Sequence, residues 1–130
     1  MRFWTTLGLA LLFASQADAQ ISGSTTSNQI LSDCKLAMGP QPKIKSDEGW
    51  GVLLSKMRCE KFLLGAVQGY EMAIQAQAGH SRASLCMPVE VNLSQAVRVY
   101  VKWLEVHPEH LHNVPIVTLF ASLIGAFPCK

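Results

Sequence analysis

The sequence predicts an all-α fold, a small disulfide-stapled helical bundle of about four helices. Apolar residues recur at spacings of three and four along much of the chain, which is the period of a helix with one buried face. Proline and glycine mark short connections between these segments, and no stretch alternates convincingly between apolar and polar residues as a half-buried strand does. Four cysteines in 130 residues supply the staples.

The first 19 residues have the order of a secretory signal peptide. Arg2 precedes an apolar stretch over residues 3–14, and Ala17-Asp18-Ala19 forms a small-residue cleavage site. Because this stretch is shorter than the roughly 20 residues that span a bilayer, we expect a cleaved signal, no membrane span in the mature chain and a periplasmic protein. The alternative is an N-terminal helix that stays in a cytosolic fold. Residues 20–28 are small and polar and predict a flexible leader to one domain, residues 29–130.

Two helices are expected in the first half of that domain. The first runs from about Gln29 to Met38 and ends at Gly39-Pro40. A second, longer helix runs from about Glu48 to Ala78, with Ser46 or Asp47 as its cap.

Two glycines lie inside the long helix. Gly65 and Gly69 are four residues apart and therefore share a face, and each costs on the order of 1 kcal/mol relative to alanine. They indicate either that another backbone packs close to this face or that the helix simply tolerates them.

Two further helices form the C-terminal third. Asn92 and Gln95 have the spacing of a capping box before a helix from about Leu93 to Val106, and Pro108 stops that helix at His107. Asn113 is the expected cap of the last helix, over residues 114–127. That helix is apolar on nearly all sides, so it forms either the centre of the fold or a dimer seam, and we favour the centre.

The cysteines are expected to pair as disulfides, because the chain is exported to an oxidising compartment. If the last two helices pack antiparallel, Cys86 lies beside Cys129, and Cys34 is left to pair with Cys59. The competing Cys59/Cys86 pair requires about twenty helical residues, at about 1.5 Å each, to double back.

The loop before the last helix contains the densest set of polar side chains that bear on function. His107, His110 and His112 lie within six residues, beside Glu109, and imidazoles at this density are able to bind a transition metal. Their spacing differs from the HExxH pattern, so we expect a solvated turn and no metal or cofactor.

Catalysis and nucleic-acid binding are both disfavoured by the sequence. The serines have no nucleophile-elbow context and the carboxylates no catalytic pairing, so we expect no enzyme activity. The net charge of +2 is spread without a basic cluster, which argues against nucleic acid as a partner.

Several short strings resemble the Rap1a/Tai family of periplasmic immunity proteins. The resemblance covers about residues 31–129 and rests on Cys86-x-Pro88, Gln95, the run from Val97 to Leu104, His107-Pro108-Glu109 and the terminal Ala126-Phe127-Pro128-Cys129. Cys59, Phe62 and Gly65 match the family loosely. Where the family typically has a Gly-Tyr pair, this chain has Lys61-Phe62.

The resemblance implies a function without catalysis. Such a protein is all-helical, often a homodimer, and protects a Gram-negative cell by covering the active site of a peptidoglycan amidase effector delivered by a type VI secretion system. The alternative is a periplasmic stress or chaperone-like binding protein without a toxin partner. Because loops on a rigid scaffold are common binding elements, we expect the partner at His107, Glu109, His110, His112 and Asn113, with the loop over residues 79–84 second.

Overall fold

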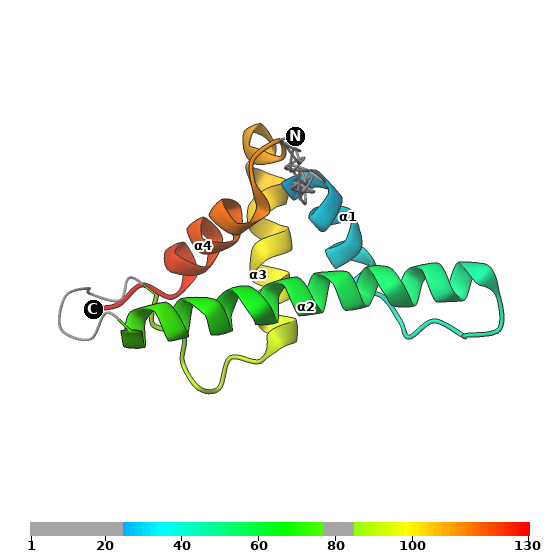
Figure 1. The fold of residues 1–130 in the computed structure, drawn as a ribbon. Coiled ribbons are helices and arrows are strands. Elements are labelled where there is room, and N and C mark those ends of the chain that lie inside the picture. Colours follow the sequence, from blue (N-terminus) through cyan, green and yellow to red (C-terminus); the bar gives the residue numbers. More distant parts are fainter. Residues whose placement is uncertain (1–24, 77–84) are drawn as a thin grey trace, which may run out of the picture.

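The computed structural model describes residues 25–76 and 85–130, and this part of the chain is helical (Figure 1). The expected signal peptide and the loop over residues 79–84 lie outside the described residues. The helices are α1 (Ser27–Ala37), α2 (Asp47–Ala76), α3 (Leu93–Val106), the short 3-10 helix η1 (Pro108–His110) and α4 (Pro115–Ala126). The predicted all-α fold is confirmed. Within the described residues, the β-type pairing is a single isolated bridge between Leu85 and Pro128.

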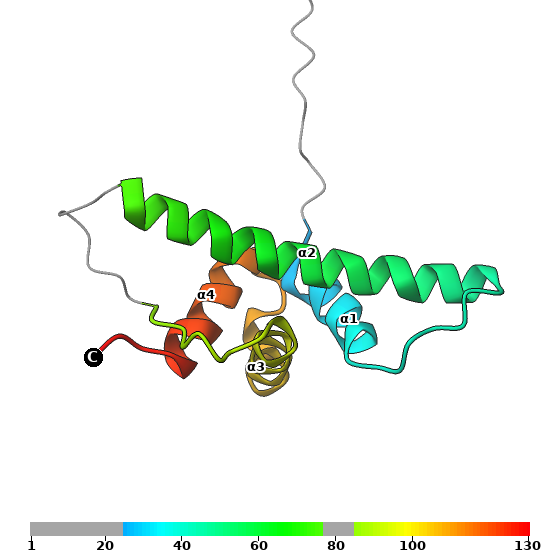
Figure 2. The same ribbon diagram turned by 90° about the horizontal axis from the view of Figure 1, so that it is seen from below.

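The helices form two layers. Helix α2 lies across one side of the molecule, and α1, α3 and α4 lie on the other side of it (Figure 2). None of the described helices combines the length and the apolar character needed to cross a membrane. The core between the layers contains the buried residues Ile30, Leu31, Cys34, Cys59, Leu63, Leu85, Ala96, Val97, Tyr100, Val101, Leu104, Leu119 and Leu123.

The centre of the fold is α3, so the expectation that the last helix is central was wrong. Helix α3 packs against α1, α2 and α4, and five of its residues are buried. Helix α4 buries the side that includes Leu119 and Leu123, but it leaves Ile116 and Val117 exposed. The helix is therefore apolar on both its buried side and its exposed side, and it is not covered all round.

Local capping signals place most helix ends. The predicted capping box of α3 is present, since Asn92 Oδ1 accepts from Gln95 N at 3.0 Å and Gln95 Oε1 accepts from Asn92 N at 2.8 Å. At the start of α2, Ser46 Oγ accepts from Gly49 N at 3.2 Å, which confirms Ser46 as the cap. Helix α1 begins at Ser27, so Ser27 and Asn28 belong to the helix and not to a leader.

Both predicted disulfides are present. Cys34 pairs with Cys59 and ties α1 to α2, with the two Cα atoms 5.0 Å apart. Cys86 pairs with Cys129 and joins the segment before α3 to the segment after α4, with a Cα separation of 4.9 Å. The competing Cys59/Cys86 pair is therefore excluded.

The glycines of α2 differ in what surrounds them. A Cβ at Gly49 would collide with the backbone of Lys43, so the turn into α2 requires glycine there. At Gly65 and Gly69, by contrast, a Cβ would meet no atom within 4 Å. No backbone of the described chain packs against these two glycines. Contacts within the described chain therefore do not support the interpretation that another backbone packs close to this face of the helix.

Candidate functional site

The segment that joins α3 to α4, residues 107–114, folds into a compact turn that we call the apex loop. It lies at the far end of α3 from the disulfide that closes the helix pair, beside the first turn of α1 (Figure 1). The backbone bonds from His110 N to His107 O (3.0 Å) and from Asn113 N to His110 O (3.0 Å) form successive turns within it. Pro108 follows His107 directly, so the α-helical hydrogen-bond pattern ends there as expected.

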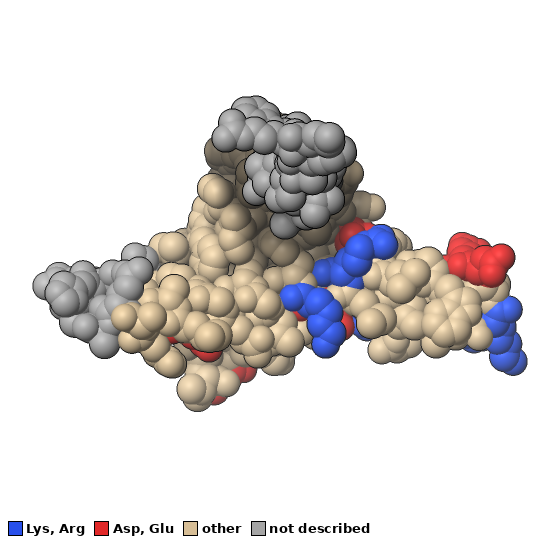
Figure 3. Space-filling model, viewed as in Figure 1, with Lys and Arg blue, Asp and Glu red and all other residues tan. Residues whose placement is uncertain are grey.

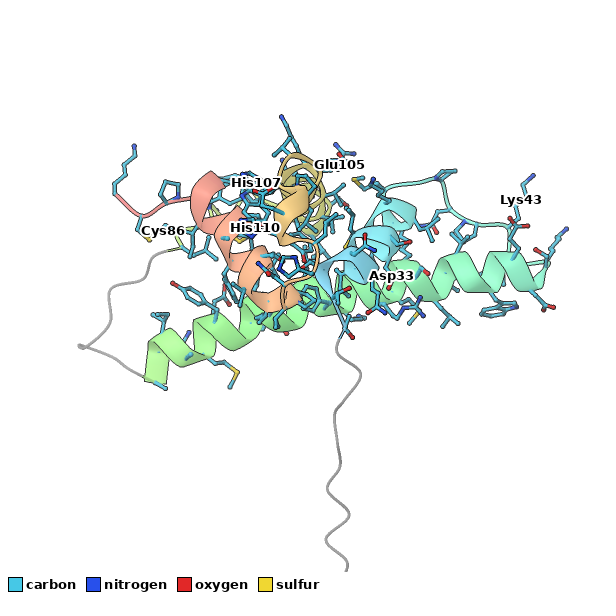
Figure 4. All side chains as sticks on the ribbon, turned by 90° about the horizontal axis from the view of Figure 1, so that it is seen from above. Asp33, Lys43, Cys86, Glu105, His107 and His110 are labelled. Atoms are coloured by element: carbon cyan, nitrogen blue, oxygen red, sulfur yellow. A yellow bond between two sulfur atoms is a disulfide. The ribbon has the colours of Figure 1, made fainter. Side chains whose placement is uncertain are left out.

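Two of the three loop histidines pack against Trp103. The His107 ring stacks on Trp103 with ring centroids 4.3 Å apart, and the His110 ring stacks on it at 5.3 Å (Figure 4). His107 Nδ1 also lies 2.8 Å from the carbonyl oxygen of Trp103, so that nitrogen carries the proton and donates. These contacts fix both rings in place and make them part of the scaffold of the apex loop.

Asn113 holds the loop together and does not cap α4. Its amide nitrogen donates to His110 Nδ1 at 3.0 Å, which places the proton of a neutral His110 on Nε2, 3.7 Å from Glu109 Oε1. The residue at the N-cap position of α4 is Val114, which has no side-chain cap, and Pro115 occupies the first helical position. The expectation that Asn113 caps the last helix was therefore wrong, because α4 begins one residue later than expected and its N-cap position falls on Val114.

Helix α1 anchors the apex loop through its own first turn. The N–H groups at the start of a helix have no partner within the helix. Here Ser27 N donates to the carbonyl of Asn113 at 3.0 Å, and Asn28 N donates to the carbonyl of Leu111 at 2.9 Å. The helix end and the loop thus satisfy each other's backbone groups.

A buried hydroxyl cluster reinforces this junction. It consists of Ser27, Tyr100 and Thr118, from α1, α3 and α4, and all three side chains are buried. Thr118 Oγ1 lies 2.8 Å from Ser27 Oγ and 3.0 Å from Tyr100 OH, and it donates to the carbonyl of Pro115 at 3.0 Å. Burial raises the pKa of the Tyr100 phenol above its ordinary value of 10.0, so the phenol stays neutral. The cluster fixes three helices at the base of the apex loop.

The apex loop and the first turn of α4 together present a mixed surface to solvent. Glu109 and His112 are exposed, and Val114 and Val117 are 61% and 60% exposed. Ile116 is also exposed. We call Glu109, His112, Val114, Ile116 and Val117 the apex surface. Apolar side chains beside hydrogen-bonding groups, on a rigid support, are typical of a protein-binding surface.

A groove of about 880 Å³ borders the apex surface. Its walls include Asp33 and Arg58, which form a two-bonded ion pair from α1 to α2, with both nitrogen-to-oxygen distances at 2.9 Å. The hydrogen bonds from the Arg58 guanidinium lower the pKa of Asp33 below its ordinary value of 3.8. The groove is also lined by Phe62 of α2 and by residues of the apex surface, among them His112, Val114 and Ile116.

The structure therefore divides the five predicted contact residues into two groups. Glu109 and His112 are exposed on the apex loop, whereas His107, His110 and Asn113 are half-buried and hold its shape. Across residues 25–76 and 85–130, no three His, Cys, Asp or Glu side chains gather in a way that holds a metal ion.

Sequence reasoning missed Ser27, Asp33, Arg58 and the exposed start of α4. A local signal existed for the first of these: Thr26 and Gln29 have capping-box spacing, and Gln29 Oε1 accepts from Thr26 N at 3.1 Å.

Comparison with known proteins gives one family. The family model of Rap1a immunity proteins matches residues 26–129. The match begins at Thr26, the N-cap of α1, and ends at Cys129, so it includes every described helix and both disulfides. No curated protein and no solved structure matches the chain significantly.

Proposed function

Because the chain belongs to the Rap1a immunity protein family, we propose that it is a periplasmic immunity protein against a type VI secretion effector. The effector that we propose is a peptidoglycan amidase, and the chain neutralises it by binding over its active site. The observation that carries the proposal is the family match over residues 26–129. A role as a binding inhibitor requires no catalytic group on this chain.

The apex surface is the element that we propose to contact the effector. It combines the exposed apolar side chains of Val114, Ile116 and Val117 with the polar side chains of Glu109 and His112. Apolar contacts at the centre and hydrogen bonds at the rim are the usual composition of an enzyme–inhibitor interface. The neighbouring groove, with its Asp33–Arg58 pair, extends this area towards α1 and α2.

The rigidity of the apex loop supports occlusion as the mechanism. Ordering flexible loops on binding reduces affinity, whereas a preorganised loop avoids that cost. The apex loop is already fixed by the rings of Trp103, His107 and His110, by the Asn113 amide and by the first turn of α1. A surface held in this way is able to block an enzyme cleft without conformational change.

The disulfides support the proposed location. Both cystines persist in an oxidising compartment such as the periplasm and are rare in the cytosol. Signal cleavage after Ala19 is part of the same proposal, as is a homodimer in solution.

A lysis experiment tests the function. A candidate peptidoglycan amidase effector from the same genome is directed to the periplasm of a host cell, with and without this chain, and culture turbidity is followed. We expect the full chain to prevent lysis and a variant that lacks residues 1–19 to fail, because it stays in the cytosol. Lysis that continues when the full chain is present in the periplasm contradicts the proposal.

A further inference from the structure

The groove beside the apex surface contains an ion pair whose two halves differ in exposure. Asp33 of α1 and Arg58 of α2 both line the groove. Asp33 lies where α1 runs along α2 (Figure 4). Its side chain is 13% exposed, whereas the side chain of Arg58 is 60% exposed. The charge of the pair that a ligand in the groove meets first is therefore the positive one.

The Arg58 guanidinium has donors that the fold does not use. A guanidinium group has five N–H donors. Nε donates to Asp33 Oδ2, and Nη2 donates to Asp33 Oδ1 and to Ser55 Oγ, each at 2.9 Å. Within the described residues no group accepts from Nη1, so its N–H groups remain for a ligand. Because Asp33 and Ser55 already hold the guanidinium plane, these donors are in place before a ligand binds.

Basic charge exceeds acidic charge around Arg58. Lys61 follows Arg58 by three positions, so the two side chains are neighbours on the α2 surface. Lys61 is exposed, and its amine forms no ion pair within residues 25–76 and 85–130. By contrast, Glu60 balances Lys56 at 4.0 Å, as Asp33 balances Arg58. Figure 3 shows basic side chains near the middle of α2, with less acidic surface visible beside them. A net positive charge thus borders the groove.

The groove also has apolar walls. Phe62 of α2 lines it together with Val114 and Ile116 at the start of α4. Val114 and Ile116 belong to the apex surface as well, so the groove and the apex surface form one continuous area. A fixed donor beside apolar walls suits a ligand that has an acceptor next to an apolar side chain.

We propose that this groove receives an acidic segment of the effector. An aspartate or glutamate carboxylate of that segment accepts from Arg58 Nη1, and an adjacent apolar side chain packs against Phe62 and Ile116. Arg58 is then a specificity-determining residue that lies outside the apex loop. The inference deepens the proposed function and rests on it, since the partner is the same effector.

Charge complementarity selects an acidic occupant. A hydrogen bond from a guanidinium to a carboxylate is shorter and stronger than a bond between neutral groups. A basic segment would instead face the exposed charges of Arg58 and Lys61, and like charges across an interface repel. Asp33 opposes an incoming carboxylate, but its side chain is largely buried.

The first experiment compares two substitutions within the ion pair. Surface plasmon resonance at low salt measures binding of residues 20–130 to the purified amidase. Arg58→Gln should raise Kd roughly tenfold, mainly through faster dissociation, because direct bonds are lost. Asp33→Asn should bind at least as tightly as the unmodified chain. The asparagine oxygen still accepts from the guanidinium, and the charge that opposes the carboxylate is gone.

The opposite signs separate recognition from a structural role. If the pair serves only to hold α1 to α2, Arg58→Gln and Asp33→Asn weaken binding alike, and that result overturns the inference. Arg58→Gln that binds like the unmodified chain also overturns it. Lys102→Gln removes one positive charge from the exposed side of α3, outside the groove, and should change Kd less than about twofold. Far-UV circular dichroism confirms that each variant is helical.

The second experiment tests the sign of the effector surface. Lys61 borders the groove without lining it, so its charge should act on the encounter between the two proteins. Lys61→Gln should lower the association rate roughly threefold at low salt, leave the dissociation rate unchanged, and lose its effect at high salt. An association rate that stays the same or rises shows that the effector surface facing Lys61 is not acidic, and it overturns the inference.

The inference and the proposed function fail in different ways. A chain that binds the amidase through Arg58 but leaves peptidoglycan hydrolysis unchanged keeps the assignment of the groove and removes the inhibitory function. A chain that inhibits the amidase, with Arg58→Gln as effective as Lys102→Gln, does the reverse.

Discussion

Ser27 Oγ lies 2.8 Å from Thr118 Oγ1, although the two residues are 91 positions apart in the sequence. The contact joins the first turn of α1 to α4, and Tyr100 of α3 completes it through Thr118. Three helices thus meet at one buried hydroxyl cluster directly beneath the apex loop. The shape of the exposed surface depends on a residue at the very start of the family match.

Ser27→Ala should therefore destabilise the fold. The change removes a buried hydroxyl that bonds to Thr118 and to the carbonyl of Asn113, and it leaves both groups with fewer partners. We expect a loss of about 1–2 kcal/mol in the free energy of unfolding, measured by urea denaturation. Ser32→Ala, on the exposed side of α1, should change it by less than about 0.5 kcal/mol. Equal effects of the two substitutions contradict a structural role for the cluster.

The two disulfides should contribute similar amounts of stability. They separate their cysteines by 25 and 43 positions, and the chain-entropy model gives about 3.5 and about 4 kcal/mol for loops of these lengths. Replacing each pair by alanines in turn should lower the free energy of unfolding accordingly. If replacing either pair lowers the free energy of unfolding by less than about 1 kcal/mol, residual structure in the unfolded chain already restrains that loop without the disulfide.

The Asp33–Arg58 pair should make stability depend on acid pH. Because the pKa of Asp33 is lowered in the folded state, the pair stabilises the fold above the ordinary pKa of 3.8, and this contribution is lost as the pH falls through the folded value. We expect only a small contribution, since Arg58 is largely exposed and solvent screens an exposed ion pair. Urea midpoints at pH 6 and pH 3 should differ less for Asp33→Asn than for the unmodified chain. An identical pH dependence in the variant rules out this contribution.

Val117→Glu should weaken effector binding while the fold stays intact. The substitution introduces a charge into the apolar part of the proposed apex surface, where burial against the amidase leaves it without a partner. We expect a loss of about 2 kcal/mol, roughly thirtyfold in Kd, by isothermal titration calorimetry. Val89→Glu adds the same charge at a site away from the apex loop and should bind normally. If both variants bind like the unmodified chain, Val117 lies outside the interface.

The local features of this fold could be predicted from the sequence. The ends of α3 depend on Asn92, Gln95 and Pro108, which act within one helical turn of the residues they restrain. The disulfide pairing followed from antiparallel packing of the last two helices, and Cys86 does lie beside Cys129. These features could be predicted because each depends either on residues close together in the sequence or on a single assumption about how two helices pack.

The remaining features depend on tertiary contacts that no local pattern specifies. Ser27 was placed in a leader because serine and threonine surround it, and its burial depends on Thr118. Asn113 has the side chain of a helix cap, but α4 begins at Pro115, so the N-cap position is Val114 and the Asn113 amide bonds to His110 instead. Helix α4 is the most apolar segment of the domain, yet the central helix is α3, because its position among α1, α2 and α4 is set by the topology.

The most direct test of the central claim is a titration of the purified amidase with residues 20–130, with hydrolysis of isolated peptidoglycan as the readout. We predict that inhibition becomes complete near one chain per amidase, and that Val117→Glu requires a large excess to reach the same inhibition. Full amidase activity in the presence of a large excess of the folded, disulfide-bonded chain would contradict the account.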